Sequence, residues 1–333
     1  MASERMLRPS IAVLIWAVLS LGAALYAIRQ GLGTPAYFGL LVAFLVLLAG
    51  EIWLAAPALL KSLQAALGPR AGIVVAFVPL AAYFAYALGT RSFTWWRAGI
   101  AAAYAVGPSM LVASAAGRKS AGAGKIGAWQ DYAAMLVIAL PIKLGWLRVL
   151  FAIPDFRLVY LLTVLLGVNA ALAAFVFVRR ADGIGYAAGW APGWGVNYVV
   201  ALALIAAIDI PLGMKLRFIS FSPRHAGWQA IAVNALAIFL FTAVPEELLF
   251  RGLLQNALGK TLANETAGWI AASIIFGFSH IANGRFPNWK YVLLATIAGF
   301  FYGYAWRRSR SLFPGALVHA SVDALWFALF RTL

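Results

Sequence analysis

The chain has 333 residues, of which 64% are hydrophobic and only 11% are charged, and its mean hydropathy is +0.89. A soluble protein carries about 25% charged residues, so this composition excludes a soluble globular domain. The formal net charge is +16 and the sequence contains no cysteine, which excludes disulfides, thiolate metal sites and a cysteine nucleophile.

Apolar stretches follow one another from end to end, and about ten or eleven of them approach the length that a helix needs to cross a bilayer. We therefore predict an all-α fold, a polytopic bundle of about 10–11 transmembrane segments. The predicted segments are 10–29, 35–60, 71–90, 95–116, 131–151, 157–178, 196–215, 228–258, 264–283, 289–306 and 311–331. Because Pro141, Lys143 and Arg148 interrupt the segment 131–151, we expect it to be re-entrant or interfacial.

The first segment is read as a transmembrane helix and not as a cleaved signal peptide, because it is long and further spans follow it directly. Arg5 and Arg8 precede it and favour a cytoplasmic N-terminus. Most other basic residues lie in short connections, such as GRKSAGAGK (117–125) and RRSR (307–310). Scattered basic loops are typical of contact with lipid headgroups. A nucleic-acid-binding protein would present one continuous basic face, so we expect no nucleic-acid partner.

The longest polar interruption is RRADGIGYAAGWAPGWG (179–195), whose glycine, proline and tryptophan content indicates a structured interfacial loop. Its glycines do not form a phosphate-binding loop, because their spacing differs and no strand precedes them. We place a domain boundary here, with an N-terminal helical half, 1–190, of unassigned role and a C-terminal half, 191–333.

Charged residues inside a membrane span are costly, so they indicate function unless they are paired. In the N-terminal half, Glu51 and Asn169 are isolated, and Asp209 stands alone in its own span. We interpret these three residues as helix-packing or interfacial groups.

The first unusual motif is PEELLFR (245–251), which holds three charged residues within an apolar segment. Glu247 and Arg251 are four residues apart and can pair on one helix face. Glu246 points about 100° away from Glu247 and is left without a local partner. An unpaired carboxylate of this kind suits a general base. A structural interpretation is equally open, in which a helix restarted by Pro245 holds both carboxylates at its N-terminus.

Two further motifs follow, FGFSH (276–280) and HASVD (319–323). Alone, His280 could be an interfacial hydrogen-bonding group, and His319 with Asp323 a packing contact within one helix. Together with PEELLFR they place two histidines and free carboxylates on nearby helices, which predicts a site that activates water, with or without a metal. The third histidine of the chain, His225, is expected in a loop.

In this order and on separate helices, Glu-Glu-x-x-x-Arg, Phe-x-x-x-His and His-x-x-x-Asp resemble the motifs of the CPBP family of intramembrane proteases. The resemblance covers residues 228–331. The family includes the type II CAAX prenyl endopeptidases and bacterial relatives tied to bacteriocin immunity and lysostaphin resistance. It implies a CPBP-type intramembrane protease domain in 191–333, the lipid bilayer and a peptide or protein substrate as partners, and a multi-pass protein of the bacterial inner membrane.

The resemblance also implies roles for single residues. Glu246 matches the glutamate that activates water, and Glu247 and Arg251 complete the first motif. His280 matches the histidine that shares the water or metal. His319 and Asp323 match the ends of the third motif, where an asparagine of the eukaryotic enzymes can donate to an oxyanion and an ionised aspartate cannot.

The family has been described both as metalloproteases and as metal-independent glutamate proteases, so two schemes follow. Zinc would take its ligands from Glu246, His280, His319 and Asp323. A metal-free scheme leaves Glu246 free as the base, and we favour it.

Two other functions remain open. The same buried groups could serve a transporter as a proton relay, although no inverted repeat is visible in the sequence. A non-proteolytic immunity or scaffold protein could share the fold. His-Glu-x-x-His, Gly-x-Ser-x-Gly and Gly-x-Gly-Asp are absent from the sequence, which argues against the other classes of intramembrane protease.

Overall fold

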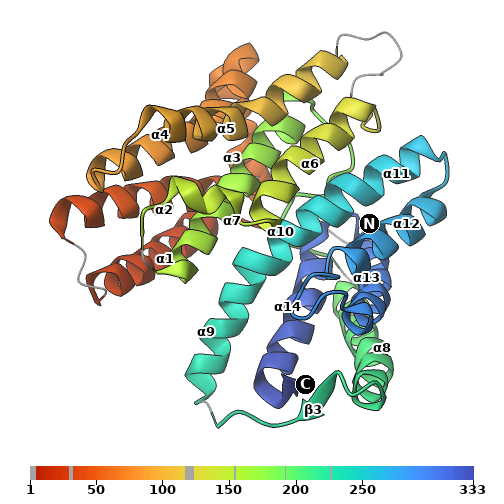
Figure 1. The fold of residues 1–333 in the computed structure, drawn as a ribbon. Helices are drawn as coiled ribbons and strands as arrows, with labels where there is room; N and C mark the ends of the chain where they lie inside the picture. Colours follow the sequence, from red (N-terminus) through yellow and green to blue (C-terminus); the bar gives the residue numbers. More distant parts are fainter. Residues whose placement is uncertain (1–4, 30–32, 117–123, 154, 192, 226) are drawn as a thin grey trace. The chain divides into compact units, whose positions relative to one another are not determined.

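The structure is a computed structural model that describes residues 5–29, 33–116, 124–153, 155–191, 193–225 and 227–333. The chain divides into two compact units, one of Met6–Asp182 and the other containing Gly183–Leu333 (Figure 1). Each unit has its own helical core and is described separately below.

Eight helices within the described residues are long and apolar enough to cross a membrane. They are Pro9–Arg29, Pro35–Leu54, Ala71–Gly89, Trp95–Ala115, Phe156–Val178, Trp194–Lys215, Trp228–Thr261 and Leu312–Leu329. The predicted all-α, polytopic membrane fold is therefore confirmed, and the chain is an integral, multi-pass membrane protein.

Helices make up almost all of the first unit. Its elements, with the short strand that precedes them, are β1 (Arg5–Met6), α1 (Pro9–Arg29), α2 (Thr34–Leu54), α3 (Pro57–Leu67), a 3-10 helix (Gly68–Arg70), α4 (Ala71–Gly89), α5 (Trp95–Ala116), α6 (Trp129–Lys143), a 3-10 helix (Trp146–Leu150), α7 (Phe156–Leu172) and a π-helical extension of α7 (Ala173–Val178).

Two predicted segments of this unit differ from the structure. The segment 35–60 is split, because Pro57 cannot donate a backbone hydrogen bond and starts the separate helix α3. The segment 131–151 becomes α6, which has 15 residues and is about 22 Å long, and then a 3-10 helix. A helix of that length does not cross a bilayer, in agreement with a re-entrant or interfacial segment.

The core of this unit forms around α7 and its π-helical extension. In this span, Phe156–Val178, 83% of the most apolar 18-residue stretch is buried. Asn169 on α7 donates from Nδ2 to the carbonyl oxygens of Leu47 and Leu165, each at 2.8 Å. Gly50 allows this approach, because a Cβ there would lie 1.9 Å from Oδ1 of Asn169. The packing role predicted for Asn169 is thus confirmed.

The second unit contains the long helix that carries the first motif. Its elements are β2 (Gly189–Trp190), α8 (Trp194–Lys215), β3 (Ile219–Phe221), α9 (Trp228–Ile238), a π-helix (Phe239–Ala243), α10 (Val244–Glu247), a π-helix (Leu248–Gln255), α11 (Asn256–Thr261), α12 (Glu265–Phe278), α13 (Trp289–Ser309), α14 (Leu312–Leu329) and β4 (Phe330–Thr332).

The helix from Trp228 to Thr261 is continuous in the structure, so the predicted restart at Pro245 does not occur. Instead, π-helical turns lie on both sides of α10. A widened turn before a proline relieves the clash between its ring and the preceding carbonyl. These turns flank Glu246 and Glu247, as is frequent for π-helical turns at functional sites.

The segment after Gly183 packs against the junction of α13 and α14. Leu312 N donates to Gly185 O at 3.1 Å, and Ser311 Oγ donates to Ala187 O at 3.1 Å. Gly183 and Gly185 have φ values of +79° and +76°, a region that favours glycine. These contacts give the glycines a structural role at the start of α14.

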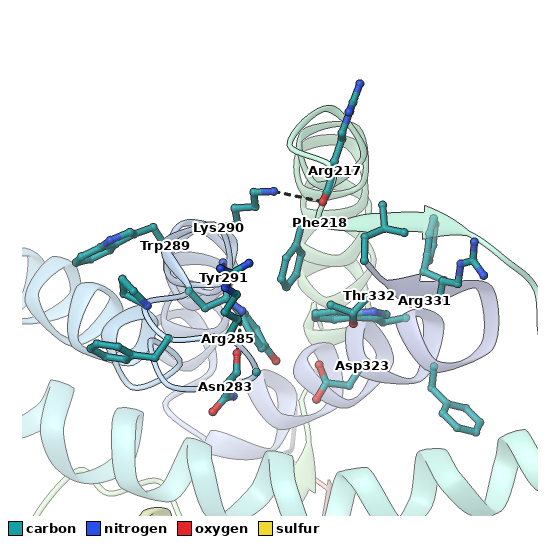
Figure 2. A pocket seen from close by; sticks show the side chains of 18 of the residues that line it. Arg217, Phe218, Asn283, Arg285, Trp289, Lys290, Tyr291, Asp323, Arg331 and Thr332 are labelled. Carbon is teal, nitrogen blue, oxygen red and sulfur yellow. Dashed lines mark hydrogen bonds between the residues drawn. The ribbon is translucent and has the colours of Figure 1, made fainter.

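One end of the second unit is hollowed by a cavity of about 1290 Å³ (Figure 2). The segments around it are the residues after α8, the loop before α9, the connection from α12 to α13, and the C-terminal part of α14 with β4. Strand β3 pairs with β4 in antiparallel register, with Ser220 opposite Arg331. His225 lies in the loop between β3 and α9 and is exposed, as predicted.

Candidate active site

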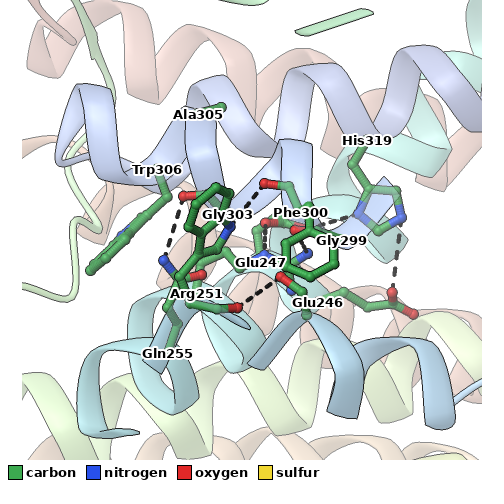
Figure 3. Close-up of polar contacts among 12 residues, drawn as sticks. Glu246, Glu247, Arg251, Gln255, Gly299, Phe300, Gly303, Ala305, Trp306 and His319 are labelled. Carbon is green, nitrogen blue, oxygen red and sulfur yellow. Dashed lines mark hydrogen bonds and ion pairs between the residues drawn. The ribbon is translucent and has the colours of Figure 1, made fainter. Parts of the chain in front are cut away.

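Glu247 is the central carboxylate of the site (Figure 3). Its side chain is fully buried, and its Oε2 lies 3.1 Å from Nε of Arg251, one turn further along the helix. Its Oε1 lies 3.0 Å from Nδ1 of His319 on α14. A carboxylate only accepts hydrogen bonds, so Nδ1 of His319 is the donor. Glu247 therefore connects the first and third sequence motifs.

Arg251 is also completely buried. Its Nη2 donates to the carbonyl of Gly299 on α13 at 3.2 Å, and its guanidinium carbon lies 4.6 Å from the ring centre of Phe276. Nε and Nη1 make no well-aligned hydrogen bond within the described part of the chain, so the contact with Glu247 is mainly ionic. The predicted pairing of Glu247 with Arg251 is confirmed.

His319 is held between aromatic rings. Tyr302 on α13 stacks on it, with ring centres 4.5 Å apart and an interplanar angle of 11°. Phe276 on α12 meets it edge-on at 5.8 Å. With Nδ1 bound to Glu247 and the ring faces covered, the free atom of the imidazole is Nε2.

Nε2 of His319 faces two carboxylates. Glu246 Oε2 lies 3.9 Å away and Asp323 Oδ2 lies 3.7 Å away. Both distances exceed a direct hydrogen bond, so a bridging water is the expected occupant. The two side chains are 31% and 32% exposed, whereas Glu247 is inaccessible. The structure thus places two solvent-accessible carboxylates beside one oriented imidazole.

His280 lies in the turn that follows α12, two residues after its last residue Phe278, and is buried. Its Nδ1 lies 2.9 Å from the carbonyl of Phe276 and 3.1 Å from Oγ of Ser279. Its ring centre lies 4.8 Å from those of Phe276 and Tyr291. His280 therefore contacts the same Phe276 ring that His319 contacts, and the two histidines share this neighbour.

The sequence offered Glu246, His280, His319 and Asp323 as ligands for a metal. Among the described residues, no group of three or more His, Cys, Asp or Glu side chains is gathered so as to hold a metal ion. Nδ1 is occupied in both histidines, which leaves Nε2 as the ring nitrogen that could face a metal. The donor set as arranged does not fit a catalytic zinc, which takes three protein ligands.

Sequence reasoning missed two residues that shape the site. Tyr302 fixes the plane of His319, but an aromatic residue in an apolar helix gives no signal of such a role. Gly315 allows α14 to approach, because a Cβ there would lie 3.1 Å from Tyr302 O and 3.4 Å from Oε2 of Glu247. A glycine one turn before His319 could have been read as a point of close helix contact.

Comparison with known proteins gives one match. Residues 228–325 match the family model described as type II CAAX prenyl endopeptidase, Rce1-like. No curated protein and no solved structure matches the chain significantly. The matched region contains Glu246, Glu247, Arg251, His280, His319 and Asp323. The resemblance drawn from the three motifs is confirmed, and residues 228–325 are similar to the Rce1-like type II CAAX prenyl endopeptidases.

Proposed function

We propose that this chain is an intramembrane endopeptidase in which Glu246 activates a water molecule for attack on a peptide carbonyl. The observation that supports this function is the position of His319 Nε2, which faces Glu246 across 3.9 Å and Asp323 across 3.7 Å. Such gaps suit a water molecule or a reacting carbonyl oxygen.

Glu246 acts first as a general base and then as a general acid. Its carboxylate removes a proton from water while the water oxygen bonds to the carbonyl carbon of the substrate. The same proton then passes to the leaving nitrogen as the carbon–nitrogen bond breaks. A general base of this kind contributes about 10²–10⁴-fold to a rate.

His319 stabilises the tetrahedral intermediate. Glu247 accepts a hydrogen bond from Nδ1–H and fixes the ring orientation, as the aspartate does in a serine protease triad. When the ring carries both protons, Nε2 donates to the developing oxyanion. Asp323 favours this doubly protonated ring by its charge, or donates itself when protonated. We assign His280 to holding the attacking water, a role that rests on the resemblance.

We further assign residues 191–333 as the protease domain and place the protein in a bacterial inner membrane with a cytoplasmic N-terminus. Arg5 and Arg8 before the first span support this orientation. The helices of 1–190 receive no catalytic role.

The test is hydrolysis by purified protein in nanodiscs, with a mixture of apolar-rich peptides in water enriched in ¹⁸O. Attack by water adds one ¹⁸O to the new C-terminus, which mass spectrometry detects. Glu246→Gln should lower the rate by about 10³-fold or more while the protein stays folded. Glu265→Gln, which alters an exposed ion pair, is the matched control. Cleavage by Glu246→Gln at the wild-type rate would overturn the proposal.

A further inference from the structure

The cavity of about 1290 Å³ reaches the candidate site at Asp323, the one site residue among its described lining residues. Asp323, which lies 3.7 Å from His319 Nε2, is the acidic residue among its described lining residues. Whatever fills this cavity therefore contacts Asp323, which is the link between the cavity and His319. The cavity is larger than the roughly 300–1,000 Å³ typical of small-molecule sites, and it can hold several residues of a peptide.

Five basic side chains also line this cavity, and four of them are labelled in Figure 2. They come from four segments of the chain and are all exposed, and we call them the basic rim. The five are Arg217, Arg224, Arg285, Lys290 and Arg331.

None of the five basic residues forms an ion pair with an aspartate or glutamate in the part of the chain that the structure describes. Three of them, Arg224, Lys290 and Arg331, donate hydrogen bonds to neutral oxygen atoms. Lys290 Nζ donates to Arg217 O at 3.4 Å, and Arg331 Nε donates to Ser220 Oγ at 3.1 Å. Five like charges around one opening produce a positive potential that attracts anionic ligands.

We propose that this cavity binds the substrate segment next to the scissile bond and selects acidic side chains in it, an inference that rests on the proposed function. The proposal is based on one arrangement: the basic rim lines the same cavity as Asp323, and Asp323 lies 3.7 Å from His319 Nε2. Substrate carboxylates lie at the rim with Arg285 and Lys290, away from the charge of Asp323. The scissile carbonyl then lies near His319.

The aromatic part of the lining defines the rest of the substrate. Phe218, Trp289, Tyr291 and Trp326 line the same cavity, and Phe218 packs against both Tyr291 and Trp326, with ring centres 5.3 and 5.4 Å apart. Aromatic walls with polar groups at their edge are typical of sites that bury an apolar ligand. The preferred segment therefore combines apolar residues with Asp or Glu.

The experiment measures peptide binding to the Glu246→Gln protein in phosphatidylcholine nanodiscs by fluorescence anisotropy. One labelled peptide alternates apolar residues with Asp and Glu, and its partner carries Asn and Gln instead. Both have an amidated C-terminus, so that only side chains differ in charge. A third probe is the Asn/Gln peptide with a free C-terminal carboxylate.

At low salt we expect the acidic peptide to bind about three- to tenfold more tightly than its amide partner, with the difference lost in 1 M salt. Arg285→Gln with Lys290→Gln should remove this preference. Arg285→Glu with Lys290→Glu should reverse it in favour of a lysine peptide. Lys260→Gln with Arg308→Gln removes the same charge elsewhere in the unit and should keep the preference. Thermal unfolding checks that each variant is folded.

Equal binding of the acidic and amide peptides would overturn the proposal. So would tighter binding only of the probe with a free C-terminus, which would assign the rim to a terminal carboxylate. A third contrary outcome is retention of phosphatidylglycerol that depends on Arg285 and Lys290 while peptide binding does not, since the rim would then hold lipid headgroups. Because binding is measured without catalysis, a failure to find cleavage would overturn only the proposed function.

Discussion

Glu247 Oε1 and His319 Nδ1 lie 3.0 Å apart, although 72 positions separate the two residues in the chain. This contact, buried on both sides, fixes which nitrogen of His319 faces the accessible carboxylates. The sequence assigned Glu247 to a structural pair with Arg251 alone. The structure gives it a second contact, so Glu247 both closes a buried ion pair and orients the imidazole.

Glu247→Asp tests this orienting role. The shorter side chain keeps the charge that Arg251 requires but withdraws the oxygen from Nδ1. A displacement of about 1 Å in such a support can cost about 10²-fold in rate, so we expect kcat to fall by that order with little change in KM. Steady-state kinetics and a melting curve measure the two effects. Glu265→Asp is the control, and an unchanged kcat in Glu247→Asp would refute the role.

The motif residues could be predicted from sequence because charge is so costly in this setting. Glu246, Glu247 and Arg251 stand out in an apolar helix, and their spacing predicts the pair at 3.1 Å. The link between Glu247 and His319 could not be predicted, because it depends on how two distant helices pack. The role of Tyr302 could not be predicted for the same reason, because its stacking on His319 depends on how α13 and α14 pack.

The transmembrane segments also differ in how well the sequence predicts them. Continuous apolar stretches such as Ala71–Gly89 are found close to their predicted bounds. Short helices were overestimated, because the apolar segment 264–283 yields the 14-residue α12 and then an irregular connection to Trp289. Hydropathy measures composition, and it does not register that α12 ends at Phe278.

Arg251→Met should destabilise the protein strongly. Arg251 and Glu247 are both fully buried, and removal of one partner leaves an uncompensated charge, which costs about 3–5 kcal/mol. Adding Glu247→Gln to Arg251→Met should recover part of this loss. Folded yield in detergent and thermal unfolding measure both variants. If Arg251→Met were fully stable yet inactive, Arg251 would belong to the chemistry and not to the scaffold.

Tyr302 is predicted to act through the plane of His319. Tyr302→Phe keeps the stacked ring, so activity should remain within about threefold of the wild type. Tyr302→Leu removes the stacking partner and should reduce kcat about tenfold or more. The pH profile of kcat provides a readout that a general packing defect would not move. Equal loss in the two variants would contradict the stacking role.

Asp155 gives a pH-dependent test in the first unit. Tyr26 Oη donates to its Oδ2 at 2.8 Å, and Arg157 N donates to its Oδ1 at 2.8 Å. The hydrogen bond from Tyr26 is the main cause that lowers the pKa of Asp155 below its usual value. The folded pKa lies below the unfolded one, so the ionised group stabilises the fold above the unfolded value of about 3.9.

This stabilisation is lost as the pH falls through the folded pKa of Asp155. We therefore expect Asp155→Asn to be less stable than the wild type at pH 7, with the difference shrinking below about pH 4. Thermal unfolding across this range measures it. Tyr26→Phe should weaken the pH dependence in the same direction, and an unaltered profile in that variant would argue against the assigned cause.

Metal removal tests how the catalytic water is held. Among the described residues, no group of three or more His, Cys, Asp or Glu side chains is gathered to hold a metal ion, and the proposed function uses Glu246 itself as the base. A chelator such as EDTA or 1,10-phenanthroline should therefore leave the activity of the purified protein unchanged, and elemental analysis should find less than stoichiometric zinc. The Glu246→Gln protein, treated in parallel, reports any cleavage by a contaminating metalloprotease. Stoichiometric zinc, with activity lost to the chelator and restored by zinc alone, would require Glu246 to become a ligand or to act on a zinc-bound water.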